Sequence, residues 1–247
     1  MEIKDKVLEM TNFFENMLMK NHACICCNRE IVDGTEFQIC KKCRKSIVPI
    51  DGNVCKVCGE SLKKGVEMCD RCKVTTFAFD VNRSYTHYEE MSSNIVKGLK
   101  FGHRKYFAEN VADMLCSMKD YFKDVDVLTF VPISADRLKQ RGFNQAEVVA
   151  TSISKKLKIP IVDMLSKVTD SKHQTELSQA ERYKNLIGSF VLKDGIKEKI
   201  KDKVVMIVDD VFTTGSTLNE CAKTIRKHKP KLIKTVTFAK TKFNLSK

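Results

Sequence analysis

The arrangement of apolar residues along the chain predicts an alternation of strands and helices. Residues 204–208 are five consecutive apolar side chains, which is typical of a strand buried on both faces inside a parallel sheet. Residues 125–131, 159–162 and 232–240 are predicted to be further strands, and residues 216–228 have the apolar spacing of a helix. This alternation predicts an α/β protein whose parallel sheet is built from βαβ units.

Other segments complete the expected elements. Residues 77–88 alternate enough to form a strand or hairpin, and residues 95–105 form a short helix that runs into a basic turn. Residues 106–118 predict an amphipathic helix, and a long helix is expected over residues 141–157. Residues 2–20 also have nearly helical apolar spacing, so we expect an N-terminal amphipathic helix packed on the rest of the protein or on a partner.

One long segment, residues 170–185, is polar and has no periodicity. Such an insertion inside an α/β domain predicts either a lid over a site or a disordered loop. No apolar run reaches membrane-spanning length, and the first 20 residues carry charges throughout, which is unlike a secretory signal. We therefore expect a cytoplasmic protein that does not span a membrane.

Eight of the eleven cysteines form four Cys-x-x-Cys pairs. A Cys-x-x-Cys turn brings two thiolates within reach of one ion, and two such turns complete a tetrahedral Zn²⁺ site. Thioredoxin-like redox chemistry needs one pair in a βαβ setting, so four pairs in series favour two structural Zn²⁺ ions. The candidate ligands are Cys24, Cys27, Cys40, Cys43, Cys55, Cys58, Cys69 and Cys72.

Spacing leaves the pairing of these ligands open. Sequential pairing, first four then last four, is simplest, and interleaved pairing is the alternative. Cys26 is expected to be a bystander next to a ligand, whereas Cys116 and Cys221 lie on apolar faces of predicted helices and are expected to be core residues. The module holds few apolar residues, so we expect bound metal to supply its folding free energy, with structural or protein-docking use favoured over direct nucleic-acid contact.

The positive charge of the chain is unevenly distributed. The formal net charge is +13, of which residues 1–76 carry +2 and residues 77–247 carry +11. A basic second part favours phosphate-rich ligands, including nucleic acid, although an excess of lysine also serves solubility.

The chemistry of the predicted sheet is concentrated where the strand at 204–208 ends. Asp209 and Asp210 come next, and a loop of small and hydroxyl-bearing residues, 213–217, leads into the helix. Unpaired N–H groups and the helix dipole make such a loop an anion site, and Gly215 can take a positive φ that lets the backbone approach the anion. The two carboxylates can accept hydrogen bonds from vicinal hydroxyls of the molecule that carries the anion.

A second loop, residues 132–137, follows the strand at 125–131, and ligands of open α/β sheets bind beyond the carboxyl ends of strands. Arg137, Lys139 and Arg141, which follow closely, suit this loop to pyrophosphate. Basic residues of the turn after residue 95 are further candidates for lining a phosphate-rich cleft, with a solvated face as the alternative: Lys97, Lys100, His103, Arg104 and Lys105.

The segment Val204–Thr217 resembles the phosphoribosyl-pyrophosphate (PRPP) signature of type I phosphoribosyltransferases. By that resemblance Asp209 and Asp210 hold the ribose hydroxyls, Thr213, Thr214, Gly215, Ser216 and Thr217 surround the 5-phosphate, and the loop with Ile133, Ser134, Arg137 and Arg141 receives pyrophosphate. An ordinary strand, turn and helix cap is the alternative. A Walker B strand is excluded because no Gly-Lys-Ser or Gly-Lys-Thr occurs in the chain.

Taken in order, the motifs are similar to those of the ComF (ComFC) family of competence proteins. The Cys-x-x-Cys pairs precede Gly98–Arg104, Val131-Pro132, Arg141–Gln145, Leu177-Ser178, Glu181-Arg182, Asn185–Phe190 and Val208–Gly215. The resemblance implies an N-terminal helix (1–21), a double zinc ribbon (22–76) and a type I phosphoribosyltransferase-like open parallel sheet with helices on both faces (77–247). It also implies a role in natural transformation, with single-stranded DNA and proteins of the DNA-uptake machinery as partners.

Three functional hypotheses follow. The first is a PRPP-binding competence protein that contacts DNA or the uptake apparatus. The second is an active transferase in which Mg²⁺ bridges the ribose hydroxyls and pyrophosphate; Asp209, Asp210 and Arg182 then belong to the catalytic set, and Arg137, Arg141 and Arg182 stabilise the leaving pyrophosphate. The third is a scaffold with a vestigial site, which the intact Asp209, Asp210 and Gly215 disfavour.

Overall fold

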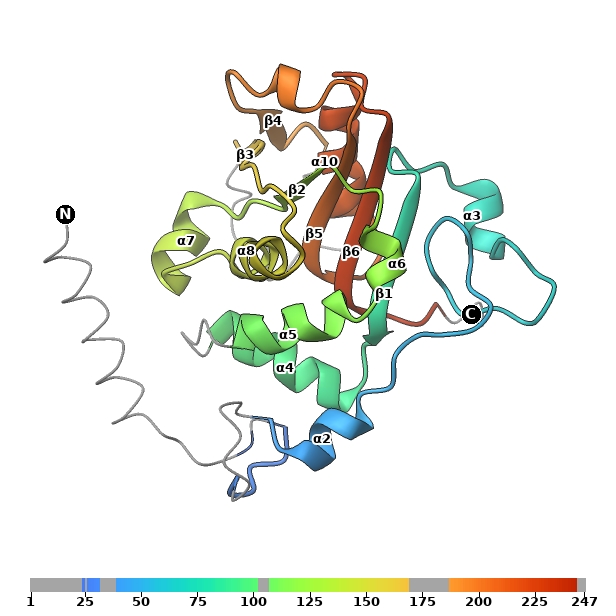
Figure 1. Cartoon of the computed structure of the whole chain (residues 1–247), viewed down its shortest axis with the longest axis vertical. Helices are drawn as coiled ribbons and strands as arrows, with labels where there is room; N and C mark the ends of the chain where they lie inside the picture. Colours follow the sequence, from blue (N-terminus) through green and yellow to red (C-terminus); the bar gives the residue numbers. More distant parts are fainter. Residues whose placement is uncertain (1–23, 25, 32–38, 102–106, 169–186, 244–247) are drawn as a thin grey trace, which may run out of the picture. The chain divides into compact units, whose positions relative to one another are not determined.

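Figure 1 shows a computed structural model of the chain. The structure describes residues 24, 26–31, 39–101, 107–168 and 187–243. The expected N-terminal helix, the polar segment 170–185 and the basic residues 103–105 lie outside them. The chain divides into two compact units, Met1–Ser46 and Ile47–Lys247.

The second unit contains a four-stranded parallel sheet (Figure 1). Its strands are β1 (Val81–His87), β2 (Val127–Phe130), β5 (Val204–Phe212) and β6 (Leu232–Lys240), in the order β1-β6-β5-β2. All three neighbouring pairs run parallel, which confirms the predicted α/β class. All four residues of β2, including Thr129, and the five apolar residues that begin β5 are buried, which fits a parallel sheet covered on both faces.

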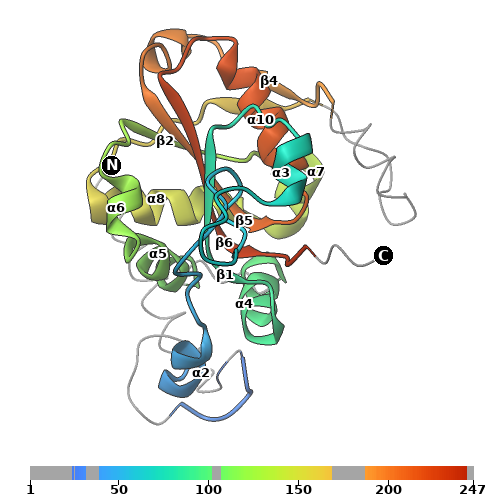
Figure 2. The ribbon, with the colours of Figure 1, turned by 90° about the vertical axis from the view of Figure 1, so that its right-hand side faces the viewer.

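Helices cover the sheet on two sides. Helix α8 (Gln145–Leu157) contacts β2 and β5 and packs against α5 (Phe107–Cys116), whereas α10 (Ser216–Arg226) contacts β5, β6 and β4. Successive side chains of a strand point to opposite faces, and Val205 and Ile207 of β5 share a core cluster with α10. Figure 2 shows α8 and α5 on the opposite side of the strands from α10.

Several shorter elements surround this frame. Helices α4 (Glu90–Phe101) and α6 (Lys119–Phe122) flank α5 in sequence, and a 3-10 turn spans Lys197–Lys199. A separate antiparallel pair, β3 (Leu165–Lys167) and β4 (Phe190–Leu192), has no counterpart among the predicted elements. Its strands are three residues long, too short for a periodic signal.

Two expectations for the carboxyl edge of the sheet need correction. Strand β5 does not end before the acidic pair, because Asp209 and Val211 remain in register with β6 through Thr237 and Ala239. The predicted strand at 159–162 is reduced to one parallel bridge, between Leu128 and Ile161. The acidic side chains therefore stand on a strand and not on a loop.

The segment expected as a loop after β2 contains helix α7 (Ala135–Arg141). The Ser134 side chain accepts a hydrogen bond from the N–H of Arg137 at the start of this helix, and Gly142 ends it with a φ of 75°. The Asn144 side chain then accepts from the N–H of Ala146 and begins α8, so the long helix starts at Gln145 and not at Arg141.

The two cysteine clusters belong to different compact units. The first unit contains Cys24–Cys43 and helix α2 (Lys41–Ser46). The second cluster, with helix α3 (Asp70–Val74), lies in the unit that holds the sheet. Cys55, Cys58 and Cys72 share one core cluster with Phe79 and with residues of β5 and α10, so this cluster packs directly on the α/β domain.

Candidate functional site

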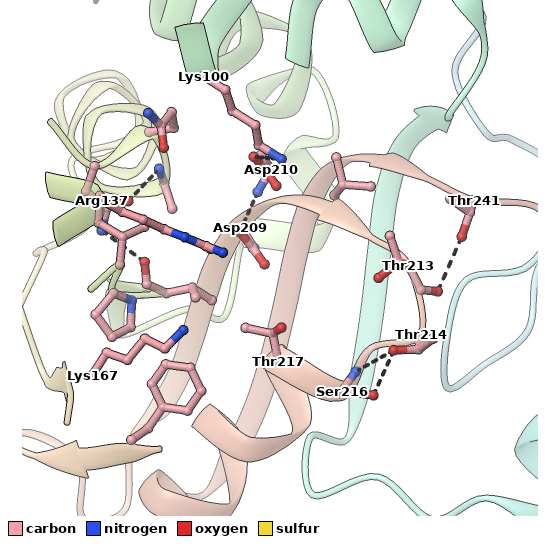
Figure 3. A pocket seen from close by; sticks show the side chains of 18 of the residues that line it. Lys100, Arg137, Lys167, Asp209, Asp210, Thr213, Thr214, Ser216, Thr217 and Thr241 are labelled. Carbon is pink, nitrogen blue, oxygen red and sulfur yellow. Dashed lines mark hydrogen bonds and ion pairs between the residues drawn. The ribbon is translucent and has the colours of Figure 1, made fainter. Parts of the chain in front are cut away.

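A cavity of about 1110 Å³ lies at the carboxyl edge of the sheet, beyond β2 and β5 (Figure 3). Six basic side chains and two carboxylates line it, so the cavity is suited to a strongly anionic ligand. Arg137 and Lys167 extend toward Asp209 and Thr217 in the close-up view (Figure 3). The charged residues are Arg71, Lys100, Arg137, Arg141, Lys167, Lys242, Asp209 and Asp210.

The two carboxylates of β5 have different partners. Asp210 is 14% exposed and forms an ion pair with Lys100 of α4, with 2.8 Å between Nζ and Oδ2. The Oδ1 atom of Asp209 accepts a hydrogen bond of 2.8 Å from the N–H of Asp210. Lys97 and Lys100 were both predicted to line a phosphate-rich cleft; Lys100 lines this cavity and Lys97 does not, and phosphate binding stays a prediction.

Burial, and then the neighbouring charge of Asp210, raise the pKa of Asp209 to about 8, although the Asp210 N–H and Lys100 oppose this shift. A carboxyl group with this pKa is largely protonated at neutral pH, so the ligand-free site holds one charge where two are possible. A ligand that offers hydroxyl donors or brings a cation favours the ionised form of the pair.

The loop between β5 and α10 is built to hold an anion. The Thr214 hydroxyl lies 2.7 Å from the Ser216 hydroxyl and accepts a hydrogen bond from the Ser216 N–H. Gly215 precedes α10 with a φ of 75°. Among the hydrogen bonds of the described residues, none has the N–H of Thr214, Gly215 or Thr217 as its donor. These donors and the N-terminal dipole of α10 together favour a phosphate group.

Two guanidinium groups, Arg137 and Arg141, face the cavity from α7. Arg141 donates a hydrogen bond of 3.1 Å to Oε1 of Gln145. Burial, and then the proximity of Arg137, lower the pKa of Arg141. An anion bound between these two guanidinium groups would relieve their mutual repulsion. Their planar arrays of N–H donors suit the oxygen atoms of a diphosphate.

Most of the predicted ligand-binding residues line this one cavity. They are Ile133, Arg137, Arg141, Asp209, Asp210, Thr213, Thr214, Ser216 and Thr217. Ser134 instead is buried and caps α7, and Gly215 contributes its backbone conformation. Arg182 lies outside the described residues.

Sequence reasoning missed part of the cavity wall. Lys167 and Phe190 come from β3 and β4, and Lys242 and Phe243 follow β6. Arg71 comes from the middle of a Cys-x-x-Cys pair, where a basic residue has no distinguishing signal. In the sequence, the family motif Asn185–Phe190 marked the β4 side of this wall but assigned it no contact with the ligand, and nothing marked Lys167.

The eight Cys-x-x-Cys sulfur atoms fall into two groups in sequential order. Within each group the atoms all lie within 4.8 Å of one another, including 3.8 Å between Cys27 and Cys40 and 3.7 Å between Cys58 and Cys69. Tetrahedral Zn²⁺ with Zn–S bonds of about 2.3 Å requires sulfur atoms about 3.8 Å apart. Both clusters therefore fit a structural zinc ion.

One thiol in each cluster has a lowered pKa and therefore ionises more readily than an ordinary cysteine. Burial would raise the pKa of Cys24 and of Cys55, but backbone N–H groups outweigh it and bring both values to about 7. The donors include the N–H of Cys40, 3.3 Å from the Cys24 sulfur, and the N–H of Cys69, 3.5 Å from the Cys55 sulfur. The repeated arrangement stabilises thiolates, which are the form that binds metal.

The remaining cysteines have no such environment. Burial raises the pKa of Cys26 to about 12 and that of Cys116 to about 11. Cys221 is fully buried in α10, in the core cluster behind β5.

Among the described residues, no helix has both the length and the apolar character to cross a membrane.

A parallel sheet with an acidic pair and an anion loop at its edge, preceded by two four-cysteine clusters, defines a phosphoribosyltransferase-fold protein with a double zinc ribbon. The phosphoribosyl transferase domain family matches residues 144–243, and the double zinc ribbon domain family matches residues 17–73. Competence protein F of Haemophilus influenzae Rd is 30% identical over 88% of this chain and 94% of its own length. The chain belongs to the ComF family of competence proteins.

Two further relatives are more distant. Competence protein ComFC of Bacillus subtilis 168 is 25% identical over 75% of this chain and 77% of its own length. The DNA utilization protein YhgH of Salmonella typhimurium LT2 is 25% identical over 75% of this chain and 89% of its own. A purine phosphoribosyltransferase structure from Pyrococcus horikoshii Ot3 aligns at 22% identity and a TM-score of 0.34, over 54% of this chain and 72% of that chain.

Proposed function

We propose that this protein binds PRPP with Mg²⁺ in the cavity at the edge of the sheet. The observation that carries the proposal is the Asp209–Asp210 pair beside an anion loop, facing the guanidinium groups of α7 across one cavity. A ribose that carries a phosphate at one end and a diphosphate at the other matches this order of carboxylates, amides and guanidinium groups.

Each part of the ligand has a proposed position. Asp209 and Asp210 accept hydrogen bonds from the ribose hydroxyls, and the loop from Thr213 to Thr217 binds the 5-phosphate through N–H and hydroxyl donors. Arg137 and Arg141, with the backbone after Pro132, bind the pyrophosphate. Mg²⁺ would neutralise the pyrophosphate charge and is bound mainly by ligand oxygen atoms and water.

Calorimetric titration with PRPP, ribose 5-phosphate and pyrophosphate, each with Mg²⁺, tests this assignment. Arg137→Met should weaken PRPP and pyrophosphate binding about tenfold and leave ribose 5-phosphate binding unchanged. Lys139→Met is the matched control, since Lys139 is exposed on the same helix but does not line the cavity. Equal losses for all three ligands would contradict the assignment.

We also propose that the protein acts on DNA taken up in natural transformation, in the cytoplasm. Three relatives carry names that refer to competence or DNA utilization, and residues 77–247 hold a formal charge of +11. Eleven cysteines without disulfides fit a reducing compartment. Direct contact predicts single-stranded DNA binding whose affinity falls steeply as salt rises. If no such binding occurs at low salt, a protein of the uptake machinery becomes the proposed contact.

Catalytic phosphoribosyl transfer is the second candidate. The observation in its favour is the wall formed by Lys167 and Phe190, which adds a cation and an aromatic face to the cavity besides the groups assigned to PRPP. In this version a nucleophile attacks C1 of the ribose, the bond to pyrophosphate breaks, and Arg137, Arg141 and Arg182 stabilise the leaving group. Release of pyrophosphate from PRPP on addition of a nucleobase or DNA would support it, and its absence with every acceptor class would leave the binding function alone.

A further inference from the structure

The second cysteine cluster contacts the phosphate loop directly. Arg71 stands in α3, between Cys69 and Cys72, and its Nη2 atom donates a hydrogen bond to the Thr214 carbonyl oxygen. Arg71 also lines the cavity. Arg71 thus lies between two candidate zinc-binding cysteines and hydrogen-bonds to the backbone of the loop that faces the PRPP cavity.

Aromatic rings hold the Arg71 guanidinium in place. Its Cζ atom lies 4.2 Å from the ring centre of Phe243 and 5.4 Å from that of Phe77. The Phe77 ring stacks on Phe79 at 4.7 Å and meets the edge of Phe212 at 6.5 Å. Phe212 is the last residue of β5, so these rings connect the cysteine cluster to the base of the phosphate loop.

The same rings fill the space beside Gly215. A Cβ atom at this position would lie 2.6 Å from Cζ of Phe212 and 3.2 Å from Cε1 of Phe77. The loop thus packs on the Phe212 and Phe77 rings, and Arg71 also lies over the Phe77 ring, so the left-handed turn at Gly215 has little room to change.

A second contact joins the cluster to the end of β6. Lys240 is fully buried, and its Nζ atom lies 3.3 Å from a carboxylate oxygen of Glu60, two residues after Cys58. The same Nζ atom lies 4.1 Å from the ring centre of Phe212 and 4.7 Å from that of Phe243. A buried ion pair of this kind contributes little net stability, but removal of one partner leaves an unpaired buried charge, so the contact between Glu60 and Lys240 is costly to break.

We propose that the second cysteine cluster, with its zinc bound, holds the phosphate loop in its ligand-binding shape, and that Arg71 is the positioning residue. Zinc bound by Cys69 and Cys72 would fix the helical turn that carries Arg71, and Arg71 fixes Thr214. The inference rests on the proposed PRPP site and gives the zinc ribbon a role in that site beyond folding.

Arg71→Met tests the proposal and Lys73→Met is its matched control, because Lys73 is a basic residue of the same helix whose exposed side chain forms an ion pair with Asp70 and does not line the cavity. Arg71→Met should keep the zinc content of the wild type and weaken Mg²⁺–PRPP binding about tenfold in calorimetry, the factor expected for one lost charged hydrogen bond. Lys73→Met should match the wild type in both measurements.

Hydrogen exchange separates positioning from a general loss of structure. In the ligand-free protein, Arg71→Met should speed exchange of the Ser216 and Asn219 amides, whose N–H groups donate to Oγ1 of Thr214 and to the Gly215 carbonyl oxygen, and should leave exchange in β6 unchanged. Arg71→Lys should lie between the wild type and Arg71→Met in affinity, because an ammonium keeps one donor but not the planar stacking.

Unchanged PRPP affinity in Arg71→Met, or unchanged exchange of the Ser216 and Asn219 amides, would overturn the proposal. If the wild type itself does not bind PRPP, the proposed function fails, and the exchange comparison in ligand-free protein still decides whether Arg71 holds the loop. The two failures are therefore distinguishable.

Discussion

The ammonium group of Lys100 lies 2.8 Å from the carboxylate of Asp210, although the two residues belong to α4 and β5. This ion pair brings a cation of the cavity wall into direct contact with one of the two neighbouring aspartates, Asp209 and Asp210. A ligand whose hydroxyls occupy Asp210 must share this carboxylate with Lys100, and its phosphates then gain from the same positive charge.

Lys100→Met should weaken PRPP binding about tenfold, because the loss of one cation from a cavity that receives several negative charges outweighs the removal of a competitor for Asp210. Calorimetric titration measures the effect. Lys97→Met on the exposed part of the same helix is the control and should bind like the wild type. Tighter binding by Lys100→Met would mean that Lys100 acts as a competitor and not as a ligand group.

The raised pKa of Asp209 predicts how stability depends on pH. Its pKa is about 8 in the folded protein against an ordinary value of 3.8, so the folded state binds the proton more tightly between these values. The free energy of unfolding should therefore fall as pH rises through this window. Asp209→Asn removes the free-energy cost of ionising this buried carboxyl group. The melting temperature of the variant should therefore exceed that of the wild type by about 3–8 °C at pH 9.

The same comparison should give a much smaller difference at pH 4, where Asp209 is protonated in the folded state and roughly half protonated in the unfolded state. Melting curves of the zinc-loaded protein, without PRPP or added Mg²⁺ and without a chelator, provide the measurement. A constant offset between the two proteins across this range would show that the carboxyl group does not titrate in it.

Gly215 and Gly195 separate backbone strain from steric fit. Both have a positive φ, 75° and 72°, but a Cβ atom at Gly195 would meet nothing within 4 Å. Gly195→Ala should cost about 1 kcal/mol of stability. Gly215→Ala should cost about 1–3 kcal/mol more, because its Cβ meets the Phe212 ring, and should also weaken PRPP binding. Chemical denaturation and calorimetry measure the two effects, and equal costs at both sites would argue against tight packing beneath the loop.

Adjacent cysteines test the assignment of the metal ligands. Cys27→Ser should reduce the zinc content from two ions to one per chain, because three sulfur ligands bind the ion much less tightly than four. Cys26→Ser should keep both ions, since burial raises the pKa of the Cys26 thiol to about 12 and leaves it protonated. Elemental analysis of purified protein gives the counts. Loss of an ion in Cys26→Ser would show that the clusters use other sulfurs.

Local signals account for what the sequence predicted correctly. The strand at 232–240 and the end of α8 at Leu157 follow from apolar periodicity, and the anion loop follows from residues that are neighbours in the chain. The end of β5 was predicted too early because two aspartates interrupt the apolar run. Pairing with β6, a tertiary interaction, carries the strand through them to Phe212.

Contacts between distant residues account for what the sequence did not predict. Arg71 and Thr214 are 143 residues apart, and no pattern in either segment indicates that they meet. Lys100 was predicted as part of a basic segment, but its pairing with Asp210 depends on the packing of α4 beside the sheet. Helix α7 was not predicted because its seven residues are largely exposed and have no apolar face.

The acidic pair of β5 provides the most direct test of the PRPP site, by calorimetric titration of the full chain with Mg²⁺ and PRPP. The control is Asp126→Asn, since Asp126 accepts a hydrogen bond of 2.8 Å from the Val204 N–H at the opposite end of the same strand. The wild type and Asp126→Asn should bind with equal affinity, and Asp209→Asn combined with Asp210→Asn should bind at least about 100-fold more weakly. Absence of binding by the wild type, or unchanged binding by the double variant, would contradict the proposed site.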